Sequence, residues 1–256
     1  GLAPRAATIV DTKRVFAAEM ASSSSTNFWS WLDASFMAMN TWSRLAEVEN
    51  DPQYYEKQWA NFEAAMLLPA NGDGESKGTQ FGFWNTSTHL FYRDDCYVHS
   101  EIYWGRGNGW AMGALVAAIQ NGTQDPHRAK YVEIFKLHAT KLASIISIDA
   151  RGGYWHSSLL DASSFPSPEM TGTASFVYGL AFGINQGLLD RATYLPTVNA
   201  AWKFMSTTAL QESGLFGYCQ PVGGSPQNNV NATSTSDFCV GQFLLAAAQV
   251  HLLVSA

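Results

Sequence analysis

The sequence predicts an all-α protein built from helical hairpins, and two observations carry this prediction. Segments with a helical spacing of apolar residues alternate with connections of two lengths, in the order helix, short turn, helix, long loop. The long loops, at 81–110, 152–169 and 214–237, are rich in aromatic residues and glycine. Because a short turn makes its two helices antiparallel, the long loops are expected to gather on one face, where a site would rest on a rigid scaffold.

The helix boundaries follow from residues that start or stop helices. Pro52 and Pro126 each follow an Asp, which can cap a helix, and proline is tolerated in the first turn. The polar run at 22–26 indicates a loop, and the aromatic segments 81–84 and 90–92 are expected to be strands or extended chain. The expected helices are 9–20, a segment with an aromatic entry at 28 that ends near 48, 53–68, 107–120, 127–147, 169–185, 192–210 and 235–253.

The composition narrows the class of ligand. The net charge of -6 and the pI of about 5.4 argue against the basic footprint of a nucleic-acid-binding protein. Charged residues make up only 14% and aromatic residues 13%, with nine Trp, a profile that favours a carbohydrate-active protein. No apolar run is expected to be long enough to cross a bilayer, so neither nucleic acid nor membrane is expected as a partner.

Cysteine and histidine usage gives little sign of a metal or a cofactor. The three Cys cannot all pair within one chain, and two readings stay open for Cys219 and Cys239: a bridge between a loop and the last helix, or free thiols. The six His are scattered singly, without the spacing of metal ligands, so no metal is expected. Glycosylation sequons at Asn85, Asn121 and Asn231 favour a secreted protein over a cytoplasmic one.

One stretch, 103–110, joins a long loop to an apolar helix and reads Tyr-Trp-Gly-Arg-Gly-Asn-Gly-Trp. Glycine permits close approach by another molecule, Trp offers a broad apolar face, and Arg supplies a planar fork of donors. Such a surface suits a sugar acid. The alternative is a helix N-terminus packed by two core Trp residues.

Five motifs, in order along the chain, resemble family 105 of the glycoside hydrolases, the unsaturated rhamnogalacturonyl hydrolases, which are related to the unsaturated glucuronyl hydrolases of family 88. The motifs are WLDASFMA at 31–38, LFYRD at 90–94, WGRGNGW at 104–110, SPEMTGTA at 167–174 and QPVG at 220–223. The resemblance implies an (α/α)6 barrel of six helical hairpins. Because fewer than twelve helices are expected, it also implies that residues 1–256 form a single barrel domain without its N-terminal hairpins, completed by an N-terminal fragment or a homo-oligomer.

The chemistry implied by the resemblance is hydration of the C4=C5 double bond of an unsaturated uronic acid, which a polysaccharide lyase leaves at the end of a pectin oligosaccharide. A carboxylic acid protonates C4, water adds at C5, and the product opens to release the next sugar. No cofactor is needed. Two rival hypotheses remain, a catalytically weakened carbohydrate-binding remnant of this fold and an (α/α)6 sugar epimerase.

The resemblance points to Asp33 and Asp94 as the catalytic carboxylates. Asp33 has an alternative role as a helix N-cap, and proximity of the two carboxylates would raise the pKa of one of them. Arg93 and Arg106 are candidates for binding the substrate carboxylate through a guanidinium fork, or for a structural ion pair with Asp94 or Asp95.

The remaining candidates for substrate binding come from the same loops and helix starts. Their alternative roles are structural, since isolated Trp residues are more often core and an acidic residue at a helix start interacts favourably with the helix dipole. These candidates are Trp104, Asn108, Trp110, Trp155, His156, Glu169 and Thr171.

Overall fold

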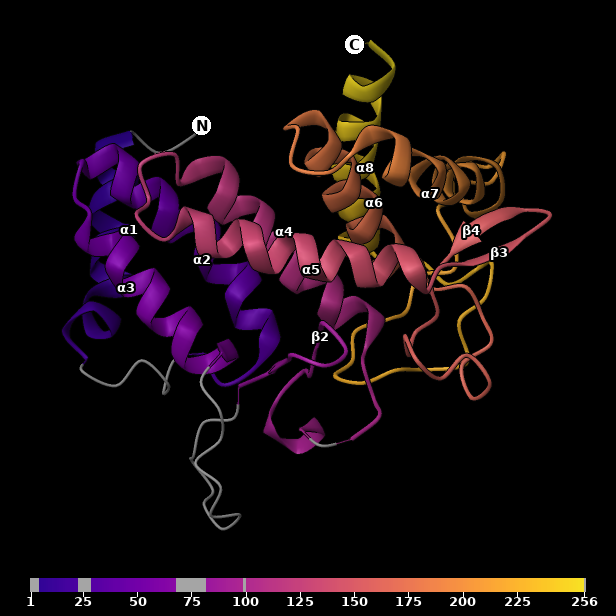
Figure 1. Cartoon of the computed structure of the whole chain (residues 1–256), viewed down its shortest axis with the longest axis horizontal. Helices are drawn as coiled ribbons and strands as arrows, with labels where there is room; N and C mark the ends of the chain where they lie inside the picture. Colours follow the sequence, from indigo (N-terminus) through magenta and orange to yellow (C-terminus); the bar gives the residue numbers. More distant parts are fainter. Residues whose placement is uncertain (1–4, 23–28, 68–81, 99, 256) are drawn as a thin grey trace.

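The computed structural model describes residues 5–22, 29–67, 82–98 and 100–255 (Figure 1). Eight α-helices run through these residues, and each corresponds to a helix predicted from the sequence. They are α1 (Arg5–Ala21), α2 (Leu32–Glu49), α3 (Gln53–Phe62), α4 (Gly105–Asn121), α5 (Arg128–Ser144), α6 (Met170–Asn185), α7 (Arg191–Phe204) and α8 (Asp237–Ser255). Short π-helical turns, Glu63–Leu67 and Met205–Ala209, extend α3 and α7.

Two small antiparallel hairpins accompany the helices. The first pairs β1 (Trp84–Asn85) with β2 (Leu90–Phe91), where the sequence predicted extended chain. The second pairs β3 (Ser147–Asp149) with β4 (Gly152–Tyr154) and was not predicted. The expected helix 127–147 is therefore too long, because the chain leaves α5 after Ser144 and turns back through Gly152, whose φ of +135° favours glycine.

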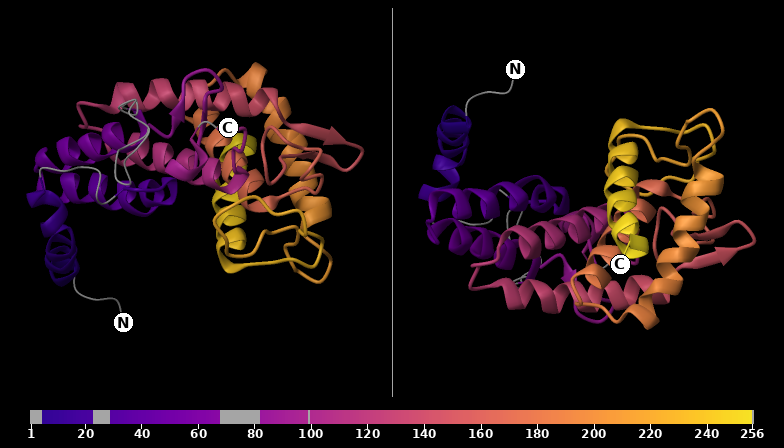
Figure 2. Two further views of the ribbon diagram at one scale, coloured as in Figure 1. Left: turned by 90° about the horizontal axis from the view of Figure 1, so that it is seen from below. Right: turned by 90° about the horizontal axis from the view of Figure 1, so that it is seen from above.

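The helices form a row of hairpins, which confirms the predicted architecture. Helices α2, α4, α6 and α8 pack side by side in that order, and α3, α5 and α7 connect them. Figure 2 shows α1 to α3 at one end, α4 and α5 between, and α6 to α8 at the other end. A single apolar core extends along the row from Trp29 to Leu253.

Glycine allows the inner helices to approach closely. A Cβ atom placed on Gly113 of α4 would lie 2.5 Å from the Phe36 ring of α2. A Cβ atom on Gly179 of α6 would lie 2.3 Å from the Met112 side chain of α4. Neither contact leaves space for a methyl group, so these glycines set the spacing of α2, α4 and α6.

The expectation that no apolar run is long enough to cross a bilayer is wrong for α8. Its 19 residues have a mean hydropathy of 1.7, which by length and composition suffices for a span. Its buried side faces α6, whereas Leu244, Leu252 and Val254 are exposed. Length and composition do not separate a span from a core helix, and we draw no membrane assignment from them.

Candidate active site

The N-termini of α2, α4 and α6 adjoin, and those of α4 and α6 lie at the ends of two of the long loops. A Cβ atom on Gly172 in α6 would lie 2.9 Å from the carbonyl carbon of Gly105, the first residue of α4. A Cβ atom on Gly107 would lie 3.6 Å from Leu32, the first residue of α2. Because a helix N-terminus carries a partial positive charge, this face favours a negatively charged group.

Asp33 lies in the first turn of α2, on this face. Its Oδ2 atom is shielded from solvent and has no hydrogen-bond partner among the described residues. The nearest cation is Arg93, whose Nε lies 4.0 Å from that oxygen. The alternative role of Asp33 as N-cap is wrong, because Trp31 occupies the cap position of α2 and no side chain caps the helix there.

Burial raises the pKa of the Asp33 carboxyl group. This effect outweighs the opposing attraction of Arg93 and Arg106, and the nearby Asp94 raises the pKa by a smaller amount. The direction agrees with the expectation that one carboxylate would have a raised pKa, but the main cause is removal from water. A carboxyl group of this kind can hold a proton at a higher pH than an exposed Asp.

Asp94 and Arg93 form an ion pair beside Asp33. Arg93 Nη1 donates to Asp94 Oδ2, and the backbone N–H of Cys96 donates to the other carboxylate oxygen at 3.0 Å. The backbone of this segment is joined to the start of α2, since Leu32 N donates to the Arg93 carbonyl at 2.7 Å. Of the two roles considered for Arg93, the structure shows the ion pair, which engages Asp94 Oδ2, while Asp94 Oδ1 accepts from Cys96 N.

Arg106 holds a loop and forms no ion pair with Asp94 or Asp95. It is 3% exposed, and its guanidinium donates to the backbone carbonyls of Gln220 at 2.8 Å, Pro221 at 3.0 Å and Gly223 at 3.0 Å. The guanidinium also lies over the rings of Trp104 and Phe238, at 4.4 and 4.9 Å. These contacts fix the loop that follows residue 219 against the start of α4.

Asn108, Glu169 and Thr171 are buried and engaged with the protein. The Asn108 amide accepts from Phe91 N at 2.8 Å and donates to the Phe91 carbonyl at 3.0 Å, which joins β2 to α4. Glu169 caps α6, where its Oε1 accepts from the Thr171 hydroxyl at 2.6 Å and from Gln220 N at 3.1 Å. These contacts favour the structural roles that the sequence left open.

The three candidate Trp side chains are buried in the protein. Trp104, Trp110 and Trp155 are 2%, 7% and 1% exposed, which favours the core alternative over stacking on a sugar. Trp31 is 41% exposed, although it directly precedes α2 and pairs with Asp94 in an isolated β-bridge. The sequence analysis missed it as a candidate, and its position two residues before Asp33 was the available signal.

His156 is tied to the β3–β4 hairpin. Its Nε2 lies 2.8 Å from the Ser147 hydroxyl, and its Nδ1 is buried without a hydrogen-bond partner among the described residues. Its backbone carbonyl packs on Gly105, where an added Cβ atom would lie 2.7 Å from the oxygen. The residue therefore lies beside the start of α4, and its ring faces the hairpin.

A disulfide joins Cys219 to Cys239, so the first of the two open readings holds. The bridge connects the start of the loop held by Arg106 with the first turns of α8, with a Cα–Cα distance of 6.0 Å. Cys96 is free and exposed. It lies with Asp94 and Asp95 within 4.8 Å, but Asp94 is already paired with Arg93, and we assign no metal to this group.

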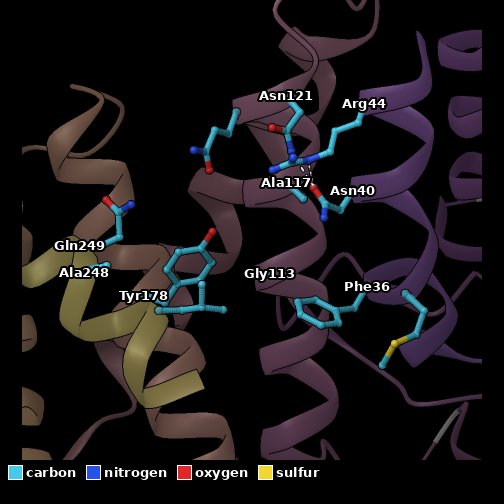
Figure 3. A pocket seen from close by; sticks show the side chains of 12 residues that line it. Phe36, Asn40, Arg44, Gly113, Ala117, Asn121, Tyr178, Ala248 and Gln249 are labelled. Atoms are coloured by element: carbon cyan, nitrogen blue, oxygen red, sulfur yellow. Dashed lines mark hydrogen bonds between the residues drawn. The ribbon is translucent and has the colours of Figure 1, made fainter. Parts of the chain in front are cut away.

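A groove of about 470 Å³ runs between α2 and α8, across α4 and α6 (Figure 3). Phe36 and Tyr178 face it from opposite sides, and Gly113 lies between them. Arg44 and Asn121 lie at one end of the groove, where Asn40 accepts hydrogen bonds from both. Asp33, Arg93 and Asp94 do not line this groove, so it is separate from the carboxylate site.

The chain matches the family description "Glycosyl Hydrolase Family 88" over residues 3–254. It belongs to this family. The resemblance to the related families 105 and 88 is thereby confirmed, with family 88 as the matching one. A solved structure described as a possible family 105 member from Salmonella enterica superposes with a TM-score of 0.68 at 16% identity, over 88% of this chain and 57% of the other, and shows the shared fold.

Two curated relatives of this family 88 chain are named unsaturated 3S-rhamnoglycuronyl hydrolases. The protein from Alteromonas sp. (strain LOR) is 31% identical over 87% of this chain and 51% of its own length. The protein from Formosa agariphila is 31% identical over 91% of this chain and 60% of its own length. The chain thus spans about half to three fifths of the length of the curated relatives it matches.

Two solved structures are closer in shape. A family 88 glycosyl hydrolase from Bacteroides vulgatus has a TM-score of 0.82 at 31% identity, over 98% of this chain and 70% of the other. A structure described as a polysaccharide lyase has a TM-score of 0.84 at 32% identity, over 99% of this chain and 70% of the other. This family 88 chain therefore shares its fold with both structures along nearly its whole length.

Proposed function

We propose that this family 88 chain removes a 4,5-unsaturated uronic acid from lyase-generated oligosaccharides by acid-catalysed hydration of the C4=C5 double bond, with Asp33 as proton donor. The observation that carries the proposal is the Asp33 carboxyl group itself. One of its oxygens is buried and unpaired among the described residues, and burial raises its pKa. A carboxyl group that keeps its proton to a higher pH than an exposed Asp is suited to general acid catalysis.

The reaction begins with transfer of the Asp33 proton to C4 of the substrate. Positive charge then develops at C5 and the ring oxygen, and water adds at C5 while the Asp33 carboxylate takes up the proton that the water loses. The resulting hemiketal opens, the bond to the next sugar breaks, and the aglycone leaves. One carboxyl group can therefore serve as acid and then as base.

The negative charge of the substrate explains the cations around Asp33. A uronic acid carries a carboxylate, and the Arg93 side chain is 28% exposed, although its Nε–H, which has no hydrogen-bond partner among the described residues, is itself buried. Trp31, whose backbone is bridged to Asp94, has an exposed aromatic side chain, of the kind on which a sugar ring stacks. Arg106 contributes positive charge and fixes the loop, but its donors serve protein carbonyls.

The relatives guide the choice of substrate. Both curated relatives are named for an unsaturated glycuronyl group and rhamnose. We therefore infer that rhamnose is the aglycone, as in lyase products of rhamnogalacturonan and related rhamnose-containing polysaccharides.

The ultraviolet absorbance of the conjugated double bond tests the proposal. The purified chain should abolish the absorbance of an unsaturated glycuronyl-rhamnose disaccharide, and Asp33→Asn should not. Asp95→Asn, which removes the same charge from an exposed neighbour, serves as control and should retain activity.

Other outcomes of this assay would point to other functions. A gain of absorbance on an intact polysaccharide would contradict hydration and indicate a lyase. Saturable binding without any loss of absorbance would indicate a carbohydrate-binding remnant, and isomerisation of a reducing sugar would indicate an epimerase.

We also infer that the protein is secreted. The Cys219–Cys239 disulfide supports an oxidising compartment. Of the sequon residues, Asn231 is exposed, whereas the Asn85 amide donates to the hydroxyls of Tyr92 and Tyr103 at 2.9 and 2.8 Å. Glycan release from protein isolated from its native host, followed by mass spectrometry, should therefore locate sugar at Asn231 and none at Asn85.

A further inference from the structure

Arg93 lies between two carboxylates. Its Nη1 is paired closely with Asp94 Oδ2, whereas its Nε lies 4.0 Å from Asp33 Oδ2, too far for a hydrogen bond. The two carboxylates therefore compete for one cation, and Asp94 holds the closer contact.

Asp94 is well placed to hold the cation. It is 7% exposed, its Oδ1 caps the 3₁₀ turn Asp95–Tyr97 by accepting from Cys96 N, and its backbone is bridged to Trp31 at the entry of α2. Asp94 and Asp33 thus lie on two segments whose backbones are joined directly to each other. Their separation is set by the backbone contacts between these segments.

The loop held by Arg106 supports Arg93 from another side. A Cβ atom on Gly224 would lie 3.3 Å from the Arg93 Cζ atom, so the backbone of this loop lies against the guanidinium. The loop leaves little room for Arg93 to move away from the two carboxylates. If Asp94 released it, the nearest anion among the described residues that face Arg93 would be Asp33.

We propose that Asp94 is a positioning residue that keeps the Arg93 guanidinium from pairing tightly with Asp33, so that Asp33 stays able to carry the proton consumed in the reaction. The inference rests on the proposed function of Asp33 as proton donor. The charged groups that face Asp33 are Arg93 and Asp94, from the segment after β2, and Arg106, from α4. Arg106 is held by three carbonyls of the loop and faces Glu169 as well, so its position does not depend on Asp94.

The consequence is a directional change in pH dependence. Removal of the Asp94 charge lets Arg93 approach Asp33, and an opposite charge at closer range favours the ionised carboxylate. Because a general acid works only when protonated, Asp94→Asn should move the basic limb of the kcat/KM profile to lower pH by about one unit. Asn can still accept from Cys96 N, so the local turn has its cap.

The test compares pH profiles of kcat/KM for the wild type, Asp94→Asn and the matched control Asp95→Asn. Asp95 is exposed and adjacent, and its change removes the same charge. The control profile should coincide with that of the wild type within a few tenths of a pH unit, since solvent screens exposed charges. Coincident profiles for Asp94→Asn and Asp95→Asn would overturn the inference, because a purely structural role would change the rate without moving the limb.

A direct titration of Asp33 tests the inference without an activity assay, and a second variant keeps the test valid if Asp94→Asn does not fold. The carbon-13 signal of the Asp33 carboxyl group, assigned by its absence in Asp33→Asn, reports protonation of this residue. Its midpoint should fall in Asp94→Asn and rise in Arg93→Gln, which removes the cation. A midpoint that does not move in Arg93→Gln would overturn the inference even if Asp94→Asn does not fold. Failure of the wild type to consume the double bond would instead contradict the proposed function and leave these titrations interpretable.

Discussion

The contact between Arg106 and the loop that follows residue 219 leads to a stability prediction whose size can be worked out. Three hydrogen bonds from a charged donor contribute about 1.5 to 3 kcal/mol each. Stacking of the guanidinium on Trp104 and Phe238 adds roughly 0.5 to 1 kcal/mol. Burial lowers the pKa of Arg106, which shows that removal from water costs part of this gain.

The balance predicts that Arg106→Leu lowers the free energy of unfolding by about 3 kcal/mol, since three carbonyls lose their donor. Urea denaturation followed by Trp fluorescence measures this change. Arg44→Leu removes a charge of the same kind from an exposed position that makes one hydrogen bond to Asn40, and it should change stability by less than about 0.5 kcal/mol. Equal effects of the two substitutions, or a loss below about 1 kcal/mol for Arg106→Leu, would refute this account of the loop.

Two further predictions concern stability. Burial raises the pKa of Asp125 from 3.8 to about 6. Protonated Asp125 therefore contributes its full stability below about pH 4, and this contribution is lost as the pH rises through about 6. Asp125→Asn keeps an acceptor for the backbone N–H of His127. Urea denaturation should show that this variant gains about 2 kcal/mol in free energy of unfolding at pH 8 and nothing at pH 4. An equal gain at both pH values would contradict the role of charge burial. Reduction of the Cys219–Cys239 disulfide, which closes 20 residues of chain, should cost about 3 kcal/mol relative to the oxidised protein. Cys96→Ser, which keeps the bridge, should lose the same amount on reduction, and an unchanged melting temperature after reduction would argue against the bridge.

The helices were predictable because their signals are local. Apolar spacing, capping residues and proline positions lie within one turn or two, and all eight helices follow from them. The β3–β4 hairpin was missed because its stability comes from packing on α7, where a Cβ atom on Gly152 would lie 2.6 Å from the Phe204 backbone nitrogen. Tertiary contacts of this kind leave no local pattern in the sequence.

In the candidate site, too, features with a local sequence signal were predictable and those that depend on tertiary contacts were not. The position of Asp33 at the start of a helix was predicted, and its proximity to Asp94 was considered as a condition for a raised pKa, but the position of Arg93 beside Asp33 was not predicted. The role of Arg106 was not predictable, because its partners lie more than one hundred residues away in a loop whose carbonyls have no sequence signature. Glu169 is shown to cap a helix by its hydrogen bonds to Thr171 N and Gly172 N, since composition alone cannot tell a capping carboxylate from a binding one.

Hydration by Asp33 is the central claim, and the fate of a solvent hydrogen tests it most directly. In deuterium oxide, the wild type should release a sugar that carries deuterium at C4 and no double bond, as read by proton and carbon-13 NMR of the product. Asp33→Asn should incorporate no deuterium under the same conditions, while Asp95→Asn should match the wild type. A released sugar that retains its C4=C5 double bond, or undiminished deuterium incorporation by Asp33→Asn, would contradict the account.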